Sequence, residues 1–113
     1  MTLTKTKSKS NIRISDSSWE KLRWAKLKTS SKSYSDLIVL LDQNITLENS
    51  TKLKNLIRYY YTDELKEKVN SKTKTIMVNF QAHKILDKIK IMSNDASFTL
   101  SDSIYFLIFV NSL

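Results

Sequence analysis

The chain has 113 residues, and its 41% hydrophobic content suits one compact domain or two very small ones and is too high for a disordered chain. It contains no cysteine, glycine or proline, which excludes disulfides, thiolate metal sites and the glycine-rich loops that hold nucleotide phosphates. A formal net charge of +8 favours an acidic partner, such as nucleic acid, an anionic membrane surface or an acidic protein.

The positive charge lies mainly near the N-terminus. Residues 1–34 hold nine basic and two acidic residues, a net charge of +7, whereas residues 35–113 carry only +1. We expect residues 1–9 to form a flexible basic arm. No apolar run is long enough to cross a bilayer, and no secretory signal is recognisable. We therefore expect no membrane partner and a cytoplasmic location, which would be the host cytoplasm if the protein is viral.

The first half of the chain predicts a strand followed by two helices. Apolar and polar residues alternate over residues 11–15, as in a β-strand. Apolar residues at helical spacing then predict a helix over 16–28, preceded by a serine-rich N-cap. Ser33 and Asp36 have the spacing of a capping box. The helix that they begin is apolar on nearly every side and is expected to end near residue 47.

The second half returns to the same order of elements. A helical pattern covers residues 51–70 and predicts one connecting helix. Residues 75–79 alternate like a strand, with Asn79 as the expected cap of the next helix. Thr99 and Asp102 repeat the capping-box spacing before a continuously apolar helix.

An internal repeat relates the two halves. A shift of 64 residues places Ile12 on Ile76, and a shift of 66 places Asp36 on Asp102. The repeated unit is strand–helix–helix, over residues 10–47 and 73–113, with 48–72 as the connection. A lone strand leaves its backbone N–H and C=O groups without partners, so we expect the two strands to pair antiparallel. The sequence leaves open whether they pair within one chain or between chains.

The residues of the first unit resemble the ribbon-helix-helix family of transcription regulators. The resemblance rests on Arg13-Ile14-Ser15-Asp16, on Leu22 and on the segment 33–38, whereas the second copy is looser, with Phe80 where a polar residue is usual. The tandem arrangement is similar to small regulators of archaeal viruses. It implies a mainly α fold with a short antiparallel β-ribbon, in which two units form a pseudo-dimer and a helix connects them.

The resemblance implies that outward side chains of the ribbon read base edges in the DNA major groove. The alternation assigns the isoleucines and Val78 to the inner face. Arginine can bond guanine and asparagine adenine through two hydrogen bonds each, whereas methionine offers only apolar contact. The predicted base-reading residues are Lys9, Asn11 and Arg13 in the first unit and Thr73, Thr75 and Met77 in the second. Because the two sets differ, we expect an asymmetric DNA site.

The resemblance also implies phosphate contacts from the N-terminus of the second helix of each unit. Unpaired backbone N–H groups and the helix dipole favour an anion there. The predicted phosphate-contacting residues are Lys5, Lys7, Lys32, Ser33, Tyr34 and Ser35 from the first unit and its arm, and Thr99, Leu100 and Ser101 from the second.

Other classes of function fit the sequence less well. His83 is the one histidine, is expected at the surface and has no evident catalytic partner, so we expect no enzyme, no cofactor and no small-molecule ligand. The two tryptophans are expected to pack rather than to stack on bases. The rival is a protein-interaction module, antitoxin-like or structural, with only non-specific nucleic-acid affinity. Homo-oligomers on DNA are also expected, because the apolar helix over 104–110 needs cover.

Overall fold

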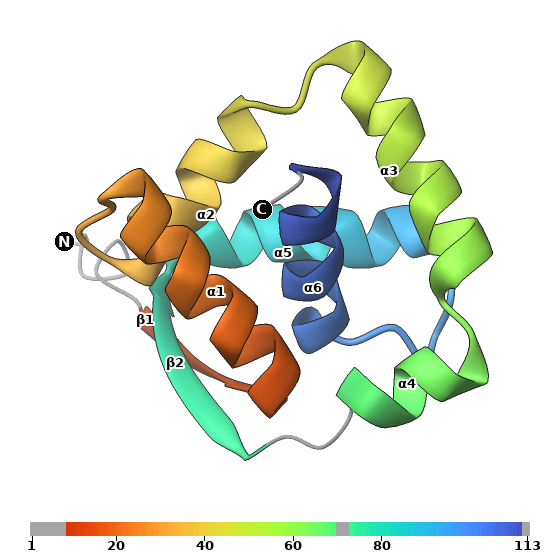
Figure 1. The fold of residues 1–113 in the computed structure, drawn as a ribbon, viewed down its shortest axis with the longest axis horizontal. Helices are drawn as coiled ribbons and strands as arrows, with labels where there is room; N and C mark the ends of the chain where they lie inside the picture. The colour runs from red at the N-terminus through yellow and green to blue at the C-terminus, as the bar shows by residue number, and fades with distance from the viewer. Residues whose placement is uncertain (1–8, 70–72, 112–113) are drawn as a thin grey trace, which may run out of the picture.

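The computed structural model describes residues 9–69 and 73–111, and this part of the chain is mainly helical with one two-stranded antiparallel sheet. The predicted fold class is confirmed at that level. Figure 1 shows the elements in chain order: β1 (Lys9–Ile14), α1 (Asp16–Thr29), α2 (Tyr34–Gln43), α3 (Leu47–Tyr60), α4 (Asp63–Val69), β2 (Lys74–Asn79), α5 (Phe80–Ser93) and α6 (Leu100–Val110).

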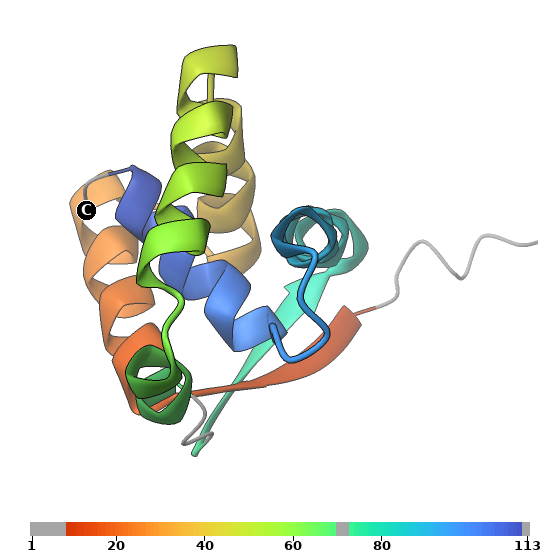
Figure 2. The same ribbon diagram turned by 90° about the vertical axis from the view of Figure 1, so that its right-hand side faces the viewer.

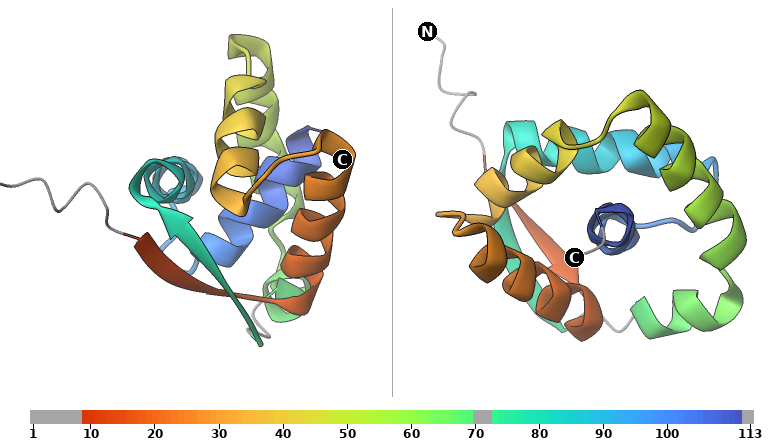
Figure 3. Two further views of the ribbon diagram at one scale, coloured as in Figure 1. Left: turned by 90° about the vertical axis from the view of Figure 1, so that its left-hand side faces the viewer. Right: turned by 45° about the horizontal axis from the view of Figure 1, so that its top comes forward.

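The two strands pair within the chain, in a register centred on the repeat. Ile12 lies opposite Ile76, so the residue reached by the 64-residue shift is also the cross-strand partner. A two-fold axis of the ribbon therefore passes through this pair. Ile12, Ile14, Ile76 and Val78 are buried, as the alternation predicts. All helices gather on this buried face and leave the other face uncovered (Figures 2 and 3).

Polar side chains begin the helices where the sequence predicts. Ser33 accepts the N–H of Asp36 at 3.0 Å, and Asn79 accepts the N–H of Ala82 at 2.9 Å. Thr99 and Asp102 form the complete, reciprocal capping box. Such bonds satisfy amides that have no acceptor within the helix.

The first helices of the two units also end alike, although the chain has no glycine. Ser30 after α1 has φ 57° and Asn94 after α5 has φ 53°. These residues are related by the same 64-residue shift. Both adopt the left-handed conformation that closes a helix C-terminus, a conformation that short polar residues tolerate.

The second helix of each unit packs on the other unit. The N–H of Ser15, at the end of β1, donates to the Ser101 hydroxyl of α6 at 3.1 Å. In return, the N–H of Asn79, at the end of β2, donates to the Ser35 hydroxyl of α2 at 2.8 Å. Accordingly, α6 packs against β1 and α1, and α2 packs against β2 and α5. The two units therefore share one core.

The prediction of one helix over 51–70 is wrong, because the structure has α3 and α4 with a break at Tyr61 and Thr62. Tyr61 packs between Phe98 and Phe106 with ring centroids 4.9 and 6.2 Å away, and Thr62 accepts the N–H of Leu65. Burial of this aromatic ring competes with continuation of the helix.

The connecting helices are part of the core. Leu53 and Ile57 of α3 are buried, and α3 and α4 contact α6. Figure 3 shows α6 at the centre of a ring formed by the other helices. The buried residues of α6 are thus covered within the chain, whereas Phe109 is 39% exposed. None of the helices in the described residues is long and apolar enough to cross a membrane.

Replacement of Ser35 and Ser101, the two serines that bond the other unit, tests whether the packing of each second helix on the other unit stabilises the fold. Ser101→Ala leaves the buried amide of Ser15 without its acceptor and is expected to lower the free energy of unfolding by about 1–3 kcal/mol. Ser35→Ala is expected to act in the same direction at Asn79. Urea unfolding followed by circular dichroism measures both. Ser17→Ala, on the first turn of α1, is the control and should stay within about 0.5 kcal/mol of wild type. Two shared-serine variants as stable as this control would contradict the argument.

Candidate nucleic-acid interface

The uncovered face of the ribbon carries five of the six predicted base-reading residues. Lys9, Asn11 and Arg13 of β1 alternate with the buried isoleucines and are exposed, as are Thr75 and Met77 of β2. Period-two alternation places these side chains on one surface. The sequence thus predicted correctly which side chains lie together there.

The sixth residue, Thr73, lies outside the ribbon. It precedes β2, is exposed, and its hydroxyl donates a hydrogen bond to the carboxylate of Asp16. The structure therefore places five of the six predicted base-reading residues in the strands, and Thr73 lies one residue before β2.

Cross-strand pairing brings unlike side chains together at the centre of this face. Asn11 lies opposite Met77, and Arg13 lies opposite Thr75, on either side of the central Ile12–Ile76 pair. Directly opposed residues in an antiparallel pair have Cβ atoms about 5 Å apart. Each pair thus combines a residue able to make two hydrogen bonds with a smaller or apolar neighbour. Met77 is 55% exposed.

The predicted phosphate contacts of the first unit are only partly accessible. Lys32 and Ser33 are exposed, and Tyr34 is half-buried with the Lys26 Nζ 5.6 Å from its ring centroid. Ser35 is buried, and its hydroxyl accepts the N–H of Asn79, so this side chain is not available to a phosphate. Lys5 and Lys7 lie outside the described residues.

The corresponding residues of the second unit, at the start of α6, are largely covered by other parts of the chain. Ser101 is buried against Ser15 and Ser18, so its side chain is not available to a phosphate either. The carboxylate of Asp102 accepts the Thr99 N–H at 2.8 Å and is itself buried. The capping box thus already bonds two N–H groups at the start of α6, those of Thr99 and Asp102. The set Thr99, Leu100 and Ser101 is therefore unsuited to phosphate binding.

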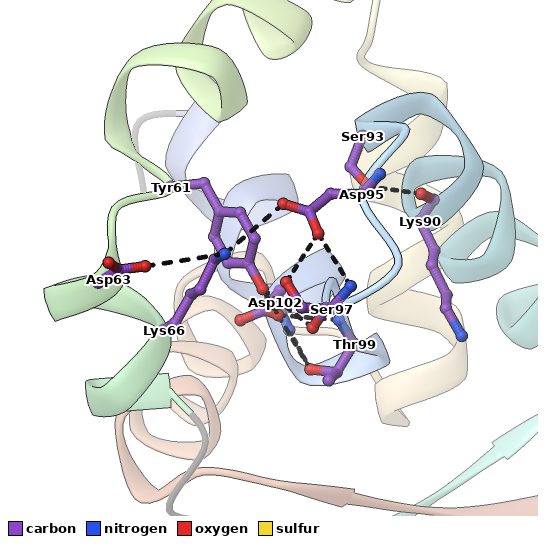
Figure 4. A network of polar contacts seen from close by, with 9 residues as sticks. All are labelled: Tyr61, Asp63, Lys66, Lys90, Ser93, Asp95, Ser97, Thr99 and Asp102. Carbon is purple, nitrogen blue, oxygen red and sulfur yellow. Dashed lines mark hydrogen bonds and ion pairs between the residues drawn. The ribbon is translucent and has the colours of Figure 1, made fainter.

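A tyrosine covers this helix start from outside. Figure 4 shows the Tyr61 hydroxyl pointing to Asp102, 2.8 Å from the carboxylate, and it also lies 3.1 Å from the Ser97 carbonyl. Burial raises the pKa of Tyr61 above its usual value, and the hydrogen bond to Asp102 raises it further. The hydroxyl therefore stays protonated and donates to the carboxylate.

An ion pair extends the same network. The Lys66 Nζ lies 4.9 Å from the Tyr61 ring centroid and 3.7 Å from the carboxylate of Asp95 (Figure 4). Hydrogen bonds from the Ser97 hydroxyl and N–H, with a smaller effect of Lys66, hold the pKa of Asp95 below its usual value. Residues of α4, of the loop before α6 and of α6 thus close one end of the molecule together.

Several single residues differ from their predicted roles. His83 is half-buried and has a partner, because its Nδ1 lies 3.0 Å from the Asp87 carboxylate at i+4 spacing. Trp24 is 64% exposed, whereas Trp19 packs on the core as predicted. Phe80 is 59% exposed, with the Lys84 Nζ 5.5 Å from its ring centroid. The repeat itself signals this exposure, since Phe80 corresponds to the exposed Asp16.

The acidic residues show no metal-binding arrangement. Within residues 9–69 and 73–111, no three histidine, cysteine, aspartate or glutamate residues are grouped so that they could hold a metal ion.

Tyr61→Phe tests whether the hydrogen bond from Tyr61 to Asp102 stabilises the start of α6. Removal of the hydroxyl leaves the buried carboxylate of Asp102 with one donor fewer, and we expect a loss of about 2 kcal/mol in the free energy of unfolding at neutral pH. A raised pKa in the folded state means that this contribution is complete below about pH 10, the usual tyrosine value, and declines above it. Denaturation series from pH 7 to 11 measure it, with Tyr59→Phe, at a 73% exposed residue, as the control. Equal stability of the two variants at pH 7 would contradict the proposed role.

Comparison of the chain with models of protein families, with curated proteins and with solved structures found no match.

Proposed function

We propose that this protein is a sequence-specific, double-stranded DNA-binding transcription regulator of the ribbon-helix-helix type, with both units of a pseudo-dimer in one chain. The observation that carries the proposal is the ribbon register. The 64-residue repeat and the antiparallel pairing share the Ile12–Ile76 pair, which is what a two-fold arrangement of two equivalent units requires. The exchange of α2 and α6 supports the same relation.

The shape of the ribbon fits the major groove of DNA. The groove is about 12 Å wide and admits a two-stranded ribbon, whose strands lie about 5 Å apart. Helices cover only one face of the ribbon, so nothing in the described residues blocks the approach of a duplex to the other (Figure 2). A net charge of +8 attracts the phosphate backbone and speeds the encounter with DNA.

The exposed side chains supply the chemistry of base reading. In the proposed complex, Arg13 donates to the O6 and N7 acceptors of guanine, and Asn11 bonds the N6 and N7 edge of adenine. Thr75 donates or accepts one hydrogen bond, and Met77 contacts a thymine methyl group. Lys9 lies at the end of β1, where it can reach either a base or a phosphate. The role is binding, and we propose no catalysis.

A protein-interaction module is the second candidate, because aromatic side chains are exposed away from the ribbon. Tyr60 and Phe109 form an edge contact at 5.6 Å between α3 and α6, and Tyr59 beside them is 73% exposed. Exposed aromatic groups of this kind are common where proteins bind one another. On this reading, affinity for DNA would be weak and independent of sequence.

Arg13→Ala tests the reading face. We expect binding of a selected duplex to weaken by about 1–3 kcal/mol, or roughly 5- to 150-fold, because a bidentate base contact is lost. Titrations at two salt concentrations on the selected and on a scrambled duplex measure affinity and selectivity. Arg58→Ala is the matched control, since it removes the same exposed charge from α3, across the core from the ribbon (Figure 1).

The outcomes separate the two candidates. Loss of selectivity in Arg13→Ala alone supports base reading. Weak binding that is equal on both duplexes and disappears with added salt would instead favour the protein-interaction module.

The unlike cross-strand pairs predict the form of the DNA site. Asn11–Met77 and Arg13–Thr75 are related by the two-fold axis but differ in chemistry, so we expect the two halves of the bound sequence to differ. Selection of bound duplexes from a random pool measures the consensus. A perfectly palindromic consensus core would contradict this reading of the ribbon.

A further inference from the structure

The surroundings of the two ends of the ribbon differ in charge at several positions that the repeat makes equivalent. At one end, Lys9 lies opposite Asn79, and we call this the Lys9 end. At the other, Ile14 lies opposite Lys74, and we call this the Lys74 end. Ser35 of α2 bonds the backbone at the Lys9 end and Ser101 of α6 bonds it at the Lys74 end, so each end adjoins the start of one second helix.

Residues that follow the strands differ most clearly. At the Lys9 end, β2 is followed by Phe80 and, one helical turn later, by Lys84, whose Nζ lies 5.5 Å from the Phe80 ring centroid. Their equivalents at the Lys74 end, reached by the 64-residue shift, are Asp16 and Glu20. These four side chains are exposed. The same two surface positions are therefore aromatic and positive at one end and doubly negative at the other.

Residues before the second helices extend the difference. Lys32, three residues before Ser35, is exposed at the Lys9 end, and its equivalent under the 66-residue shift is the buried Phe98. Lys9 itself corresponds to the uncharged Thr73. Across these equivalent positions, the Lys9 end carries three lysines and one carboxylate, Asp36. The Lys74 end carries three carboxylates, of which that of Asp102 is buried, and two cations, Lys74 and Arg23, both placed over the Trp19 ring.

The Lys74 end is also covered. Lys74 is held over the Trp19 ring, with its Nζ 4.8 Å from the centroid. The carboxylate of Asp102 is buried beneath Tyr61, and α4, which contacts α1 and α6 there, adds the exposed acids Asp63 and Glu64. A DNA phosphate approaching this end meets repulsion from Asp16 and Glu20 and finds the start of α6 already occupied.

We propose that this protein anchors the DNA backbone from one end of its ribbon only, through the surface formed by Lys9, Lys32, Lys84 and Phe80. The inference rests on the proposed function and adds a polarity to it. Phosphates on one flank of the site are neutralised by lysines, and those on the other flank stay solvated. A chain bound in this way has a fixed direction on its site, beyond any difference in the bases that it reads.

Hydroxyl-radical footprinting on one duplex, selected from a random pool and carrying a single oriented site, tests the polarity. Wild-type protein is expected to protect the sugar–phosphate backbone on one flank of the ribbon contact. The double variant K32A/K84A is expected to lose that protection, and the slope of log affinity against log salt should fall by about two units. The control K52A/K54A removes two exposed lysines from α3 and should leave both readouts unchanged.

The outcomes distinguish this inference from the function on which it rests. Selective binding by the wild type with equal protection of both flanks, or an unchanged salt slope in K32A/K84A, overturns the polarity and leaves DNA reading intact. Failure of the wild type to bind any selected duplex above scrambled DNA overturns both. Protection of one flank that K32A/K84A alone abolishes supports both.

Discussion

The pairing of two strands that lie in different halves of the chain is the constraint on which the rest of the structure depends. β1 and β2 would each leave a row of backbone groups without partners, and each finds its partner only in the other. Pairing brings the second helix of each unit over the strand and first helix of the other. Ser35 accepts the amide of the last residue of β2 and Ser101 accepts the amide just after β1, so the contacts that join the units also end the strands and begin α5 and α1.

Covalent connection breaks the symmetry of this arrangement. The two units are joined once, through α3 and α4, and these helices cover α6. The sequence of α6 is adapted to that cover: its buried Phe106, Ile108 and Val110 correspond to Leu40, Asp42 and Asn44 in and after α2. Tyr61 then occupies the space over Asp102. Equivalent helices thus have different surroundings, and one end of the ribbon is closed while the other stays open.

The proposed function depends on a backbone in which the two units are arranged alike and on side chains that differ between the units. The frame presents a ribbon of suitable width with one bare face. The side chains on that face include polar groups able to bond base edges and an exposed methionine, and several flanking charges differ in sign between the ends. Specificity for a DNA sequence and the direction of binding on it would therefore come from a few exposed positions whose side chains take no part in the core.

The sequence by itself determined the features that depend on neighbouring residues. Alternation over 11–15 and 75–79 specified the strands and their inner faces, and Ser33, Asn79 and Thr99 specified helix starts, because periodicity and capping involve only residues a few positions apart. The alternation also placed Lys9, Asn11, Arg13, Thr75 and Met77 on the exposed side of the strands, whereas Thr73 lies before β2. Tertiary structure alone decided the rest: the break at Tyr61, the burial of Ser35 and Ser101, the closure over Asp102 and the exposure of Trp24. Each of these depends on tertiary contacts between residues that are far apart in the sequence. The local sequence pattern does not show which distant residues will be in contact.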